Sequence, residues 1–190
     1  MRMRNTLKPK AAGNSITVAT ARDARALVAL RTAVAQDLTQ KFGEGHWSAC
    51  PSKADVTRQL RASHVLVARR EANIVGTVRL TTAKPWAIDS SSFTPVTSAY
   101  YVLGLAVAPE ARGLNVGRDL MEAAKDAARA RPIEALWLDA YDHGAGAGPF
   151  YLKCGFRKVG RTQYREVPLI YYEWLTSPRG ARLPNSPRDA

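Results

Sequence analysis

The sequence predicts a single domain of mixed α/β (α+β) class, and three observations lead to that prediction. Short strand-like runs outnumber helical segments along the chain. One helical segment separates two apolar runs, at residues 102–108 and 134–140. Short polar turns join other neighbouring runs as hairpins. Strands first, a helix between two central strands and hairpins at the edges predict a mixed sheet covered by helices.

Capping residues and hydrophobic spacing define the elements of the first half. Thr20 and Asp23 have the spacing of a capping box, and Ser52 and Asp55 repeat it before a second, shorter helix. A 17-residue connection with two prolines then precedes the central strands, and connections of this length are often functional or mobile. The expected order is a strand at 15–19, a helix to about 40, a loop at 41–51, a short helix, a hairpin of 64–69 and 73–81, and the connection 82–98.

The second half is organised around one apolar strand and the turn that follows it. Residues 102–108 have the composition of a strand buried on both faces, and Pro109 ends that run. A helix with apolar residues at helical spacing follows and ends before Pro132. The remaining expected elements are a strand at 134–140, a flexible turn at 144–148, a short helix at 149–154 capped by Gly155, and strands at 156–159 and 167–175.

The turn after the central strand has the chemistry of an anion site. Between Arg112 and Arg118, backbone N–H groups near a helix N-terminus can converge on one point. Gly113 and Gly117 allow a close approach of the backbone to a ligand. We therefore expect this turn to bind a phosphate-like group.

Two motifs resemble the signatures of the GCN5-related N-acetyltransferase (GNAT) family. Residues 112–117, Arg-Gly-Leu-Asn-Val-Gly, follow a Leu-Ala-Val strand and resemble its acyl-CoA pyrophosphate loop, in which Arg or Gln precedes two residues, Gly, one residue, and Gly or Ala. Residues 150–156, Phe-Tyr-Leu-Lys-Cys-Gly-Phe, resemble its second signature. The chain departs from the pattern at Asn115, where the family has a glycine, but Asn is the other residue that readily adopts left-handed geometry.

The resemblance implies a GNAT-like fold and acetyl-CoA as cosubstrate. The central sheet would be mixed and mostly antiparallel, flanked by about four helices, with splayed parallel central strands holding the pantetheine arm. An acetyl group would pass to a primary amine by direct attack in a ternary complex, without a metal or a covalent enzyme intermediate. The implied cosubstrate contacts are Leu105, Val107, Arg112, Gly113, Leu114, Asn115, Val116, Gly117, Arg118, Ala147 and Tyr151.

Tyr151 stands where the family often has its general acid. A phenol of pKa near 10 protonating a thiolate of pKa near 8.5 is uphill by roughly 2 kcal/mol, which a favourable position can offset. For the general base the residues leave alternatives open: Asp139 in a strand, Glu44 or His46 in the glycine-rich loop, or a chain of water. Glu44, His46 and Trp47 are the expected acceptor-binding residues, by analogy with the family's acceptor pocket.

Composition limits the other functions. The net charge is +12, and six of these charges lie near the two ends of the sequence, at residues 1–14 and 176–190. We expect residues 1–14 to be a flexible basic arm and residues 176–190 a disordered tail. The folded domain is then expected at residues 15–175. Two cysteines 104 positions apart form no metal motif. No apolar run has membrane-spanning length and the N-terminus lacks a secretory core, so we expect a cytoplasmic protein.

Two alternative functions remain open at this stage. Asn115 in place of the family's glycine, and Gly144 in place of an asparagine that the family frequently has, allow a non-catalytic acyl-CoA-binding sensor. The basic charge allows a nucleic-acid-binding protein, although no helix-turn-helix, zinc-finger or RRM signature is present. The acceptor is expected to be a small-molecule or peptide amine, and an edge strand near the C-terminus can pair two copies as a homodimer.

Overall fold

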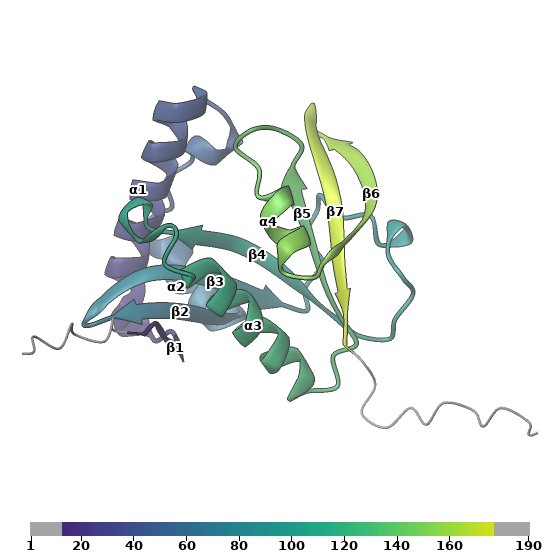
Figure 1. The fold of residues 1–190 in the computed structure, drawn as a ribbon, viewed down its shortest axis with the longest axis horizontal. Helices are drawn as coiled ribbons and strands as arrows, with labels where there is room; N and C mark the ends of the chain where they lie inside the picture. The colour runs from purple at the N-terminus through teal and green to yellow at the C-terminus, as the bar shows by residue number, and fades with distance from the viewer. Residues whose placement is uncertain (1–12, 177–190) are drawn as a thin grey trace, which may run out of the picture. The chain divides into compact units, whose positions relative to one another are not determined.

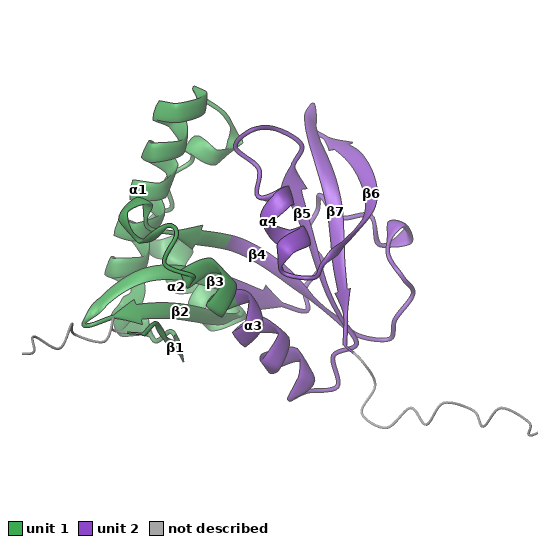
Figure 2. Ribbon diagram, in the orientation of Figure 1, with its two compact units in different colours: residues 1–78, 105–120 green, residues 79–104, 121–190 purple. Residues whose placement is uncertain are grey.

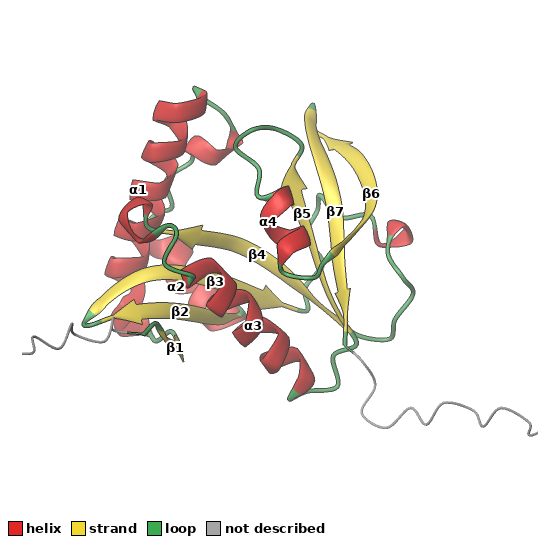
Figure 3. Cartoon of the chain, in the orientation of Figure 1, coloured by secondary structure: helices red, strands yellow, loops and turns green. Residues whose placement is uncertain are grey.

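The computed structural model describes residues 13–176 and confirms the mixed α/β class (Figure 3). Apart from residues 13, 14 and 176, the expected arm and tail lie outside the described residues. The strands are β1 Ser15–Val18, β2 His64–Arg70, β3 Asn73–Thr81, β4 Ala99–Val107, β5 Ala135–Tyr141, β6 Arg157–Tyr164 and β7 Val167–Leu175. The helices are α1 Ala24–Phe42, α2 Lys53–Ala62, α3 Val116–Arg129 and α4 Gly148–Lys153, with 3-10 turns η1 Ala21–Asp23, η2 His46–Ser48, η3 Ser90–Ser92 and η4 Pro109–Ala111.

The seven strands form one mostly antiparallel sheet in the order β1-β2-β3-β4-β5-β7-β6. β4 and β5 are a parallel pair, joined through α3. Their register pairs Ala99–Tyr101 with Ala135–Trp137, although both strands continue beyond the last pair. The parallel strands therefore part after three residue pairs, as the family resemblance implied.

The chain divides into two compact units, which Figure 2 distinguishes by colour. Unit 1 comprises residues 1–78 and 105–120, and unit 2 comprises residues 79–104 and 121–190. β3, β4 and α3 each contribute residues to both units. The loop at residues 112–118 therefore belongs to unit 1, whereas Asp139 and Tyr151 belong to unit 2.

The core of unit 1 packs α1 and α2 against β2. Ala24 and Leu27 lie one turn apart on α1 and contact Val56 of α2 and the β2 residues Val65 and Val67. The Ser52 hydroxyl accepts a hydrogen bond from the Asp55 amide at 3.1 Å, which confirms the predicted cap of α2. This packing determines where α1 stands beside the loop after β4.

In unit 2, two adjacent tyrosines of β7 pack on opposite faces of the strand, as alternation requires. The Tyr171 hydroxyl donates to the Ala87 carbonyl at 2.6 Å and accepts from the Asp89 amide at 3.0 Å. Tyr172 packs against Tyr151 of α4 with ring centroids 5.8 Å apart. Figure 1 shows α4 in front of β5 and beside β7. One face of this part of the sheet thus carries residues 82–98, and the other carries α4.

Three expectations differ from the structure. Residues 82–98 are anchored rather than loose, because Ile88 and Phe93 are 1% and 4% exposed in the core with Trp137. β6 extends to Tyr164, since pairing with β7 continues well past residue 159. The strand at 102–108 is not buried on both faces, because Gly104 is exposed beyond the last β4–β5 pair and has a φ of 59°.

Within residues 13–176, no helix combines the length and the apolar content that crossing a bilayer requires.

Candidate active site

The loop after β4 has the backbone geometry of an anion site. The Ala108 amide donates to the Val75 carbonyl at 2.9 Å, which fixes the end of β4 against β3. Gly113 and Asn115 both have positive φ, 79° and 59°, so Asn115 adopts the left-handed conformation that the sequence allows it. α3 then begins at Val116 and runs for 14 residues.

Four consecutive amides at the start of α3 lack backbone partners. Among residues 13–176, no backbone carbonyl accepts a hydrogen bond from the N–H groups of residues 115–118. The helix dipole adds partial positive charge at the same end. Unpaired donors and a helix N-terminus together form a ready site for a phosphate group.

The two arginines of the loop lie in different surroundings. The Arg112 guanidinium pairs with the Asp37 carboxylate of α1 at 2.5 Å, and Lys41 binds the same carboxylate at 2.8 Å. Hydrogen bonds from Lys41 and Arg112 hold the pKa of Asp37 below its ordinary value. Arg118 is exposed and has no ion-pair partner in the described part of the chain. Arg118 is therefore the less compensated cation of this loop.

In unit 2, Asp139 is a partly buried carboxylate on β5. Burial raises its pKa, and a hydrogen bond from its own backbone N–H opposes this shift. No other hydrogen bond or ion pair reaches this carboxylate from residues 13–176. β5 pairs Asp139 with Tyr171, so its side chain shares the sheet face of Tyr171 and Trp137. A carboxylate in this setting is a stronger base than an exposed one.

Tyr151 lies on α4, packed among other aromatic rings. Its ring centroid lies 5.8 Å from that of Tyr172 and 5.9 Å from that of Phe156. Burial, followed by the charge of Asp139, raises the pKa of the Tyr151 phenol. The hydroxyl makes no hydrogen bond to the described residues. Asp139 and Tyr151 are thus within electrostatic range of each other, and the phenol is protonated at neutral pH.

Ala147 stands directly before α4, at its N-cap. Its carbonyl accepts hydrogen bonds from the Phe150 and Tyr151 amides, both at 3.1 Å. At the next residue, a Cβ on Gly148 would lie 2.4 Å from the Tyr172 hydroxyl oxygen. Close packing at this turn therefore sets the position from which Tyr151 projects.

Comparison with known proteins agrees with this geometry. A family model described as the acetyltransferase (GNAT) family matches residues 31–156. This chain belongs to the GNAT acetyltransferase family. No curated protein sequence matches the chain.

Solved structures share the GNAT fold at low sequence identity. A ribosomal-protein-alanine N-acetyltransferase from Brucella melitensis is 21% identical, with a TM-score of 0.66, and the match covers 85% of this chain and 99% of that one. YncA from Salmonella typhimurium, described as a putative acetyltransferase with acetyl-CoA, is 15% identical (TM-score 0.66; 90% and 98% covered). PaiA N-acetyltransferase from Thermoplasma acidophilum, solved with coenzyme A, is 14% identical (TM-score 0.68; 85% and 99% covered).

The remaining GNAT-derived site residues fall in unit 1. Leu105 and Val107 lie in β4 beyond Gly104, and both are partly buried. Glu44 and His46 are exposed around η2, and the Trp47 indole N–H donates to the Gly43 carbonyl at 3.0 Å. The structure thus groups residues 112–118 in the turn after β4 and the first turn of α3, and groups Asp139, Ala147 and Tyr151 in unit 2.

Three residues near these groups are absent from the sequence prediction. Asp37 holds Arg112, and Asn14 contacts the same loop. Tyr141 lies two residues after Asp139, and burial together with the Asp139 charge raises its pKa. Alternation along β5 would have pointed to Tyr141, but no local pattern identifies Asp37 or Asn14 as neighbours of a loop so distant in the chain.

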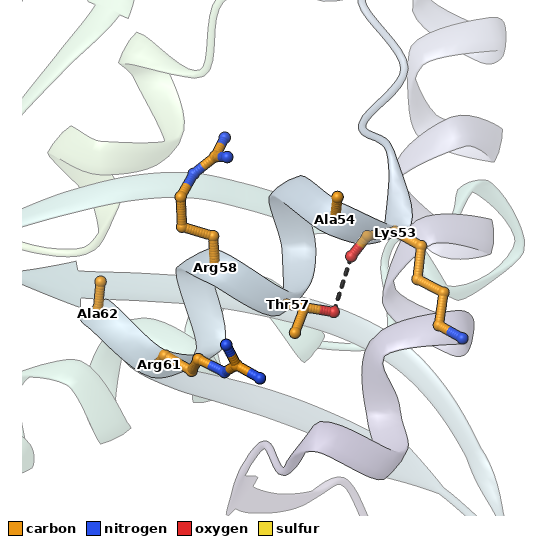
Figure 4. A pocket seen from close by; sticks show the side chains of 6 residues that line it. All are labelled: Lys53, Ala54, Thr57, Arg58, Arg61 and Ala62. Carbon is orange, nitrogen blue, oxygen red and sulfur yellow. Dashed lines mark hydrogen bonds between the residues drawn. The ribbon is translucent and has the colours of Figure 1, made fainter.

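A separate hollow of about 720 Å³ lies over the outer face of α2 (Figure 4). Lys53, Arg58 and Arg61 line it, and Arg58 points away from the other two. Arg58 also pairs with Asp55. Anion sites need donors that converge on one point, and these cations do not converge.

Proposed function

We propose that this chain transfers an acetyl group from acetyl-CoA to a primary amine by direct attack in a ternary complex. Its membership of an acetyltransferase family supports the reaction class. The observation that carries the proposal is the run of four amides at residues 115–118 after β4, to which no carbonyl of residues 13–176 is an acceptor. Such a run suits the diphosphate of a coenzyme A thioester.

The cosubstrate would be held mainly by backbone groups. The amides of residues 115–118 would bind diphosphate oxygens, and Arg118 would add positive charge that no described ion pair compensates. Arg112 would contribute less because Asp37 shares its charge. PaiA with coenzyme A and YncA with acetyl-CoA, which share the fold, support this choice of cosubstrate.

The oxygen of the thioester carbonyl gains negative charge in the transition state and needs a hydrogen-bond donor to stabilise it. By the family resemblance, the backbone N–H of Leu105 or Val107 would bind this oxygen. One such donor is typically worth about 3 kcal/mol in the transition state.

Tyr151 would protonate the leaving thiolate. Its raised pKa keeps the phenol protonated. The same shift makes proton transfer to a solvated thiolate cost more than the roughly 2 kcal/mol expected for unperturbed groups. A thiolate leaving into the same apolar surroundings has its own pKa raised by burial, which reduces that difference.

Asp139 would take the proton from the attacking amine. Its raised pKa makes the carboxylate a better base, and its sheet face differs from that of Tyr172 and Tyr151. Acid and base would then act from opposite faces of β5, just beyond the last β4–β5 pair. Glu44, His46 or a water chain are the competing bases, and Glu44, His46 and Trp47 the proposed acceptor contacts.

The acceptor would be a small-molecule or peptide amine. Structures with the same fold are named for a ribosomal-protein alanine and for an aminoglycoside, so the fold does not choose between these classes. An amine library with detection of released thiol identifies the acceptor.

The test of the proposal is calorimetric titration with acetyl-CoA and with CoA at two salt concentrations. One-to-one binding is expected, and it should be lost in Gly117→Glu, which places a bulky anion among the phosphate-binding amides. Ala62→Glu is the matched control, since it adds the same charge on the exposed end of α2. Equal affinity in wild type and Gly117→Glu would refute the assignment of the loop.

The other two functions have distinct signatures in these experiments. A non-catalytic sensor binds acetyl-CoA but releases no thiol with any amine. A nucleic-acid-binding protein shifts DNA in a strongly salt-dependent manner and ignores acetyl-CoA.

A further inference from the structure

Asn14 links the start of the edge strand β1 to the phosphate-binding loop. Its Nδ2 donates to the Leu114 carbonyl at 3.0 Å and to Oδ2 of Asp119 at 2.6 Å, across 100 and 105 residues of chain. Its Oδ1 is buried and accepts no hydrogen bond from the described residues, so the amide is held through its donor alone. β1 is itself fixed, because Ser15 pairs with Arg69 of β2.

The Leu114 carbonyl belongs to the same planar peptide group as the Asn115 N–H. In a trans peptide the carbonyl and the N–H point in opposite directions, so a bond to one orients the other. The Asn115 N–H is the first of the four unpaired amides, and Asn115 has a φ of 59° without being a glycine. The hydrogen bond from Asn14 therefore aims the first phosphate donor and supports a backbone conformation that costs free energy.

The negative charge of Asp119 lies close to the proposed phosphate-binding amides. It is in the first turn of α3, and its amide donates to the Asn115 carbonyl at 2.9 Å. A carboxylate near a helix N-terminus stabilises the helix but repels a bound anion. The bond from Asn14 holds Oδ2 and offsets part of its charge.

We propose that Asn14 is a positioning residue for cosubstrate binding, which acts by orienting the Leu114–Asn115 peptide and restraining Asp119. The inference rests on the proposed function of the loop. Asn14 lies outside both GNAT motifs, and the proposed role is to orient the loop for binding a diphosphate.

The experiment measures the acetyl-CoA Kd by calorimetry, with KM and kcat, in full-length variants. Asn14→Ala should raise Kd and KM about tenfold, the effect of losing one or two hydrogen bonds to a polar or charged group, and leave kcat within about twofold. Asn14→Asp should raise Kd further, because it places a second carboxylate beside Asp119. The double variant Asn14→Asp/Asp119→Asn should recover part of that loss, because the side-chain amide now at position 119 can donate a hydrogen bond to the carboxylate now at position 14.

Gln163→Ala, at an exposed amide side chain of β6, is the matched control and should match wild type. Wild-type Kd in Asn14→Ala, or a fall in kcat and melting temperature that parallels the rise in Kd, would overturn the positioning role. Absence of acetyl-CoA binding in the wild type would instead refute the proposed function itself. Failure of the double variant to improve on Asn14→Asp would remove Asp119 from the inference.

Discussion

Two acidic side chains on neighbouring strands of unit 2 lie in opposite surroundings. β7 places Glu173 on the same sheet face as Tyr171, and the pairing of Tyr171 with Asp139 puts Asp139 on that face too. Glu173 is 0% exposed and accepts bonds from the Thr94 amide at 2.9 Å, the Thr94 hydroxyl at 2.7 Å and Arg157 Nε at 2.7 Å. Among the described residues, the Asp139 carboxylate accepts a hydrogen bond only from its own backbone N–H.

The difference separates a structural carboxylate from a reactive one. Donors around Glu173 replace the water lost on burial, so its charge ties the connection 82–98 to β7. The carboxylate of Asp139 lacks such donors, so its negative form costs folding free energy and gains basicity. Groups that lower stability in this way are characteristic of functional sites.

Removing the charge of Glu173 should have the largest effect on stability. Glu173→Gln should lower the free energy of unfolding by about 2 kcal/mol, because the buried amide loses one acceptor oxygen and turns an N–H group toward the donors of Thr94 and Arg157. Urea denaturation measures this, with Glu166→Gln in the exposed β6–β7 turn as control. Turnover per folded molecule should stay near wild type. A loss equal to that of the control would show that the network contributes little.

Tyr151→Phe tests the proposed general acid. Loss of the proton donor should lower kcat about a hundredfold, and acetyl-CoA affinity should change little. Tyr172→Phe removes a hydroxyl from the same aromatic cluster and serves as control. Steady-state kinetics with thiol detection decides: equal kcat values in the two variants would remove Tyr151 from the role of acid.

Asp139→Asn should change activity and stability in opposite directions. Turnover should fall about tenfold, less than for Tyr151→Phe, because water can carry part of the proton transfer. Burial favours the protonated form of Asp139 by raising its pKa, so the wild type loses that stability as the pH rises through this pKa. The variant should therefore melt at higher temperature than wild type at about pH 8.

That stability difference should vanish as the pH falls below 3.8, the ordinary pKa of the carboxyl group. The turnover rate of the wild type should rise with pH as Asp139 loses its proton, and the turnover rate of Asp139→Asn should not show this rise. Calorimetric melting across the pH range, combined with pH–rate profiles, measures both effects. A variant less stable than wild type at neutral pH would place Asp139 with Glu173 among the structural acids.

Thr94→Val should give the smallest effect. It removes one of several donors to Glu173 and an acceptor for Arg157, and keeps the Thr94 amide. A cost of about 1 kcal/mol in unfolding free energy is expected, without a change in kcat. A cost as large as that of Glu173→Gln would mean that the Thr94 hydroxyl dominates the network.

Local patterns predicted the elements well, and packing decided what they missed. The Ser52–Asp55 cap and the left-handed Asn115 are confirmed because they depend on residues a few positions apart. The sequence predicts too short a β6 because the distal half of this strand is polar, whereas hydrogen bonds to β7 keep it extended. The anchoring of residues 82–98 depends on Tyr171 and Glu173, which lie about 80 residues further along the chain.

The GNAT motifs, the amide donors after β4 and the tyrosine of the second signature can be identified without a structure, because backbone conformation and helix ends follow from neighbouring residues. The electrostatic setting of these groups depends on tertiary packing. Arg112 meets Asp37 across 75 residues and Asn14 meets Leu114 across 100. Periodicity tells which face of an element is buried, but the partner of a polar group is determined only when distant segments pack together.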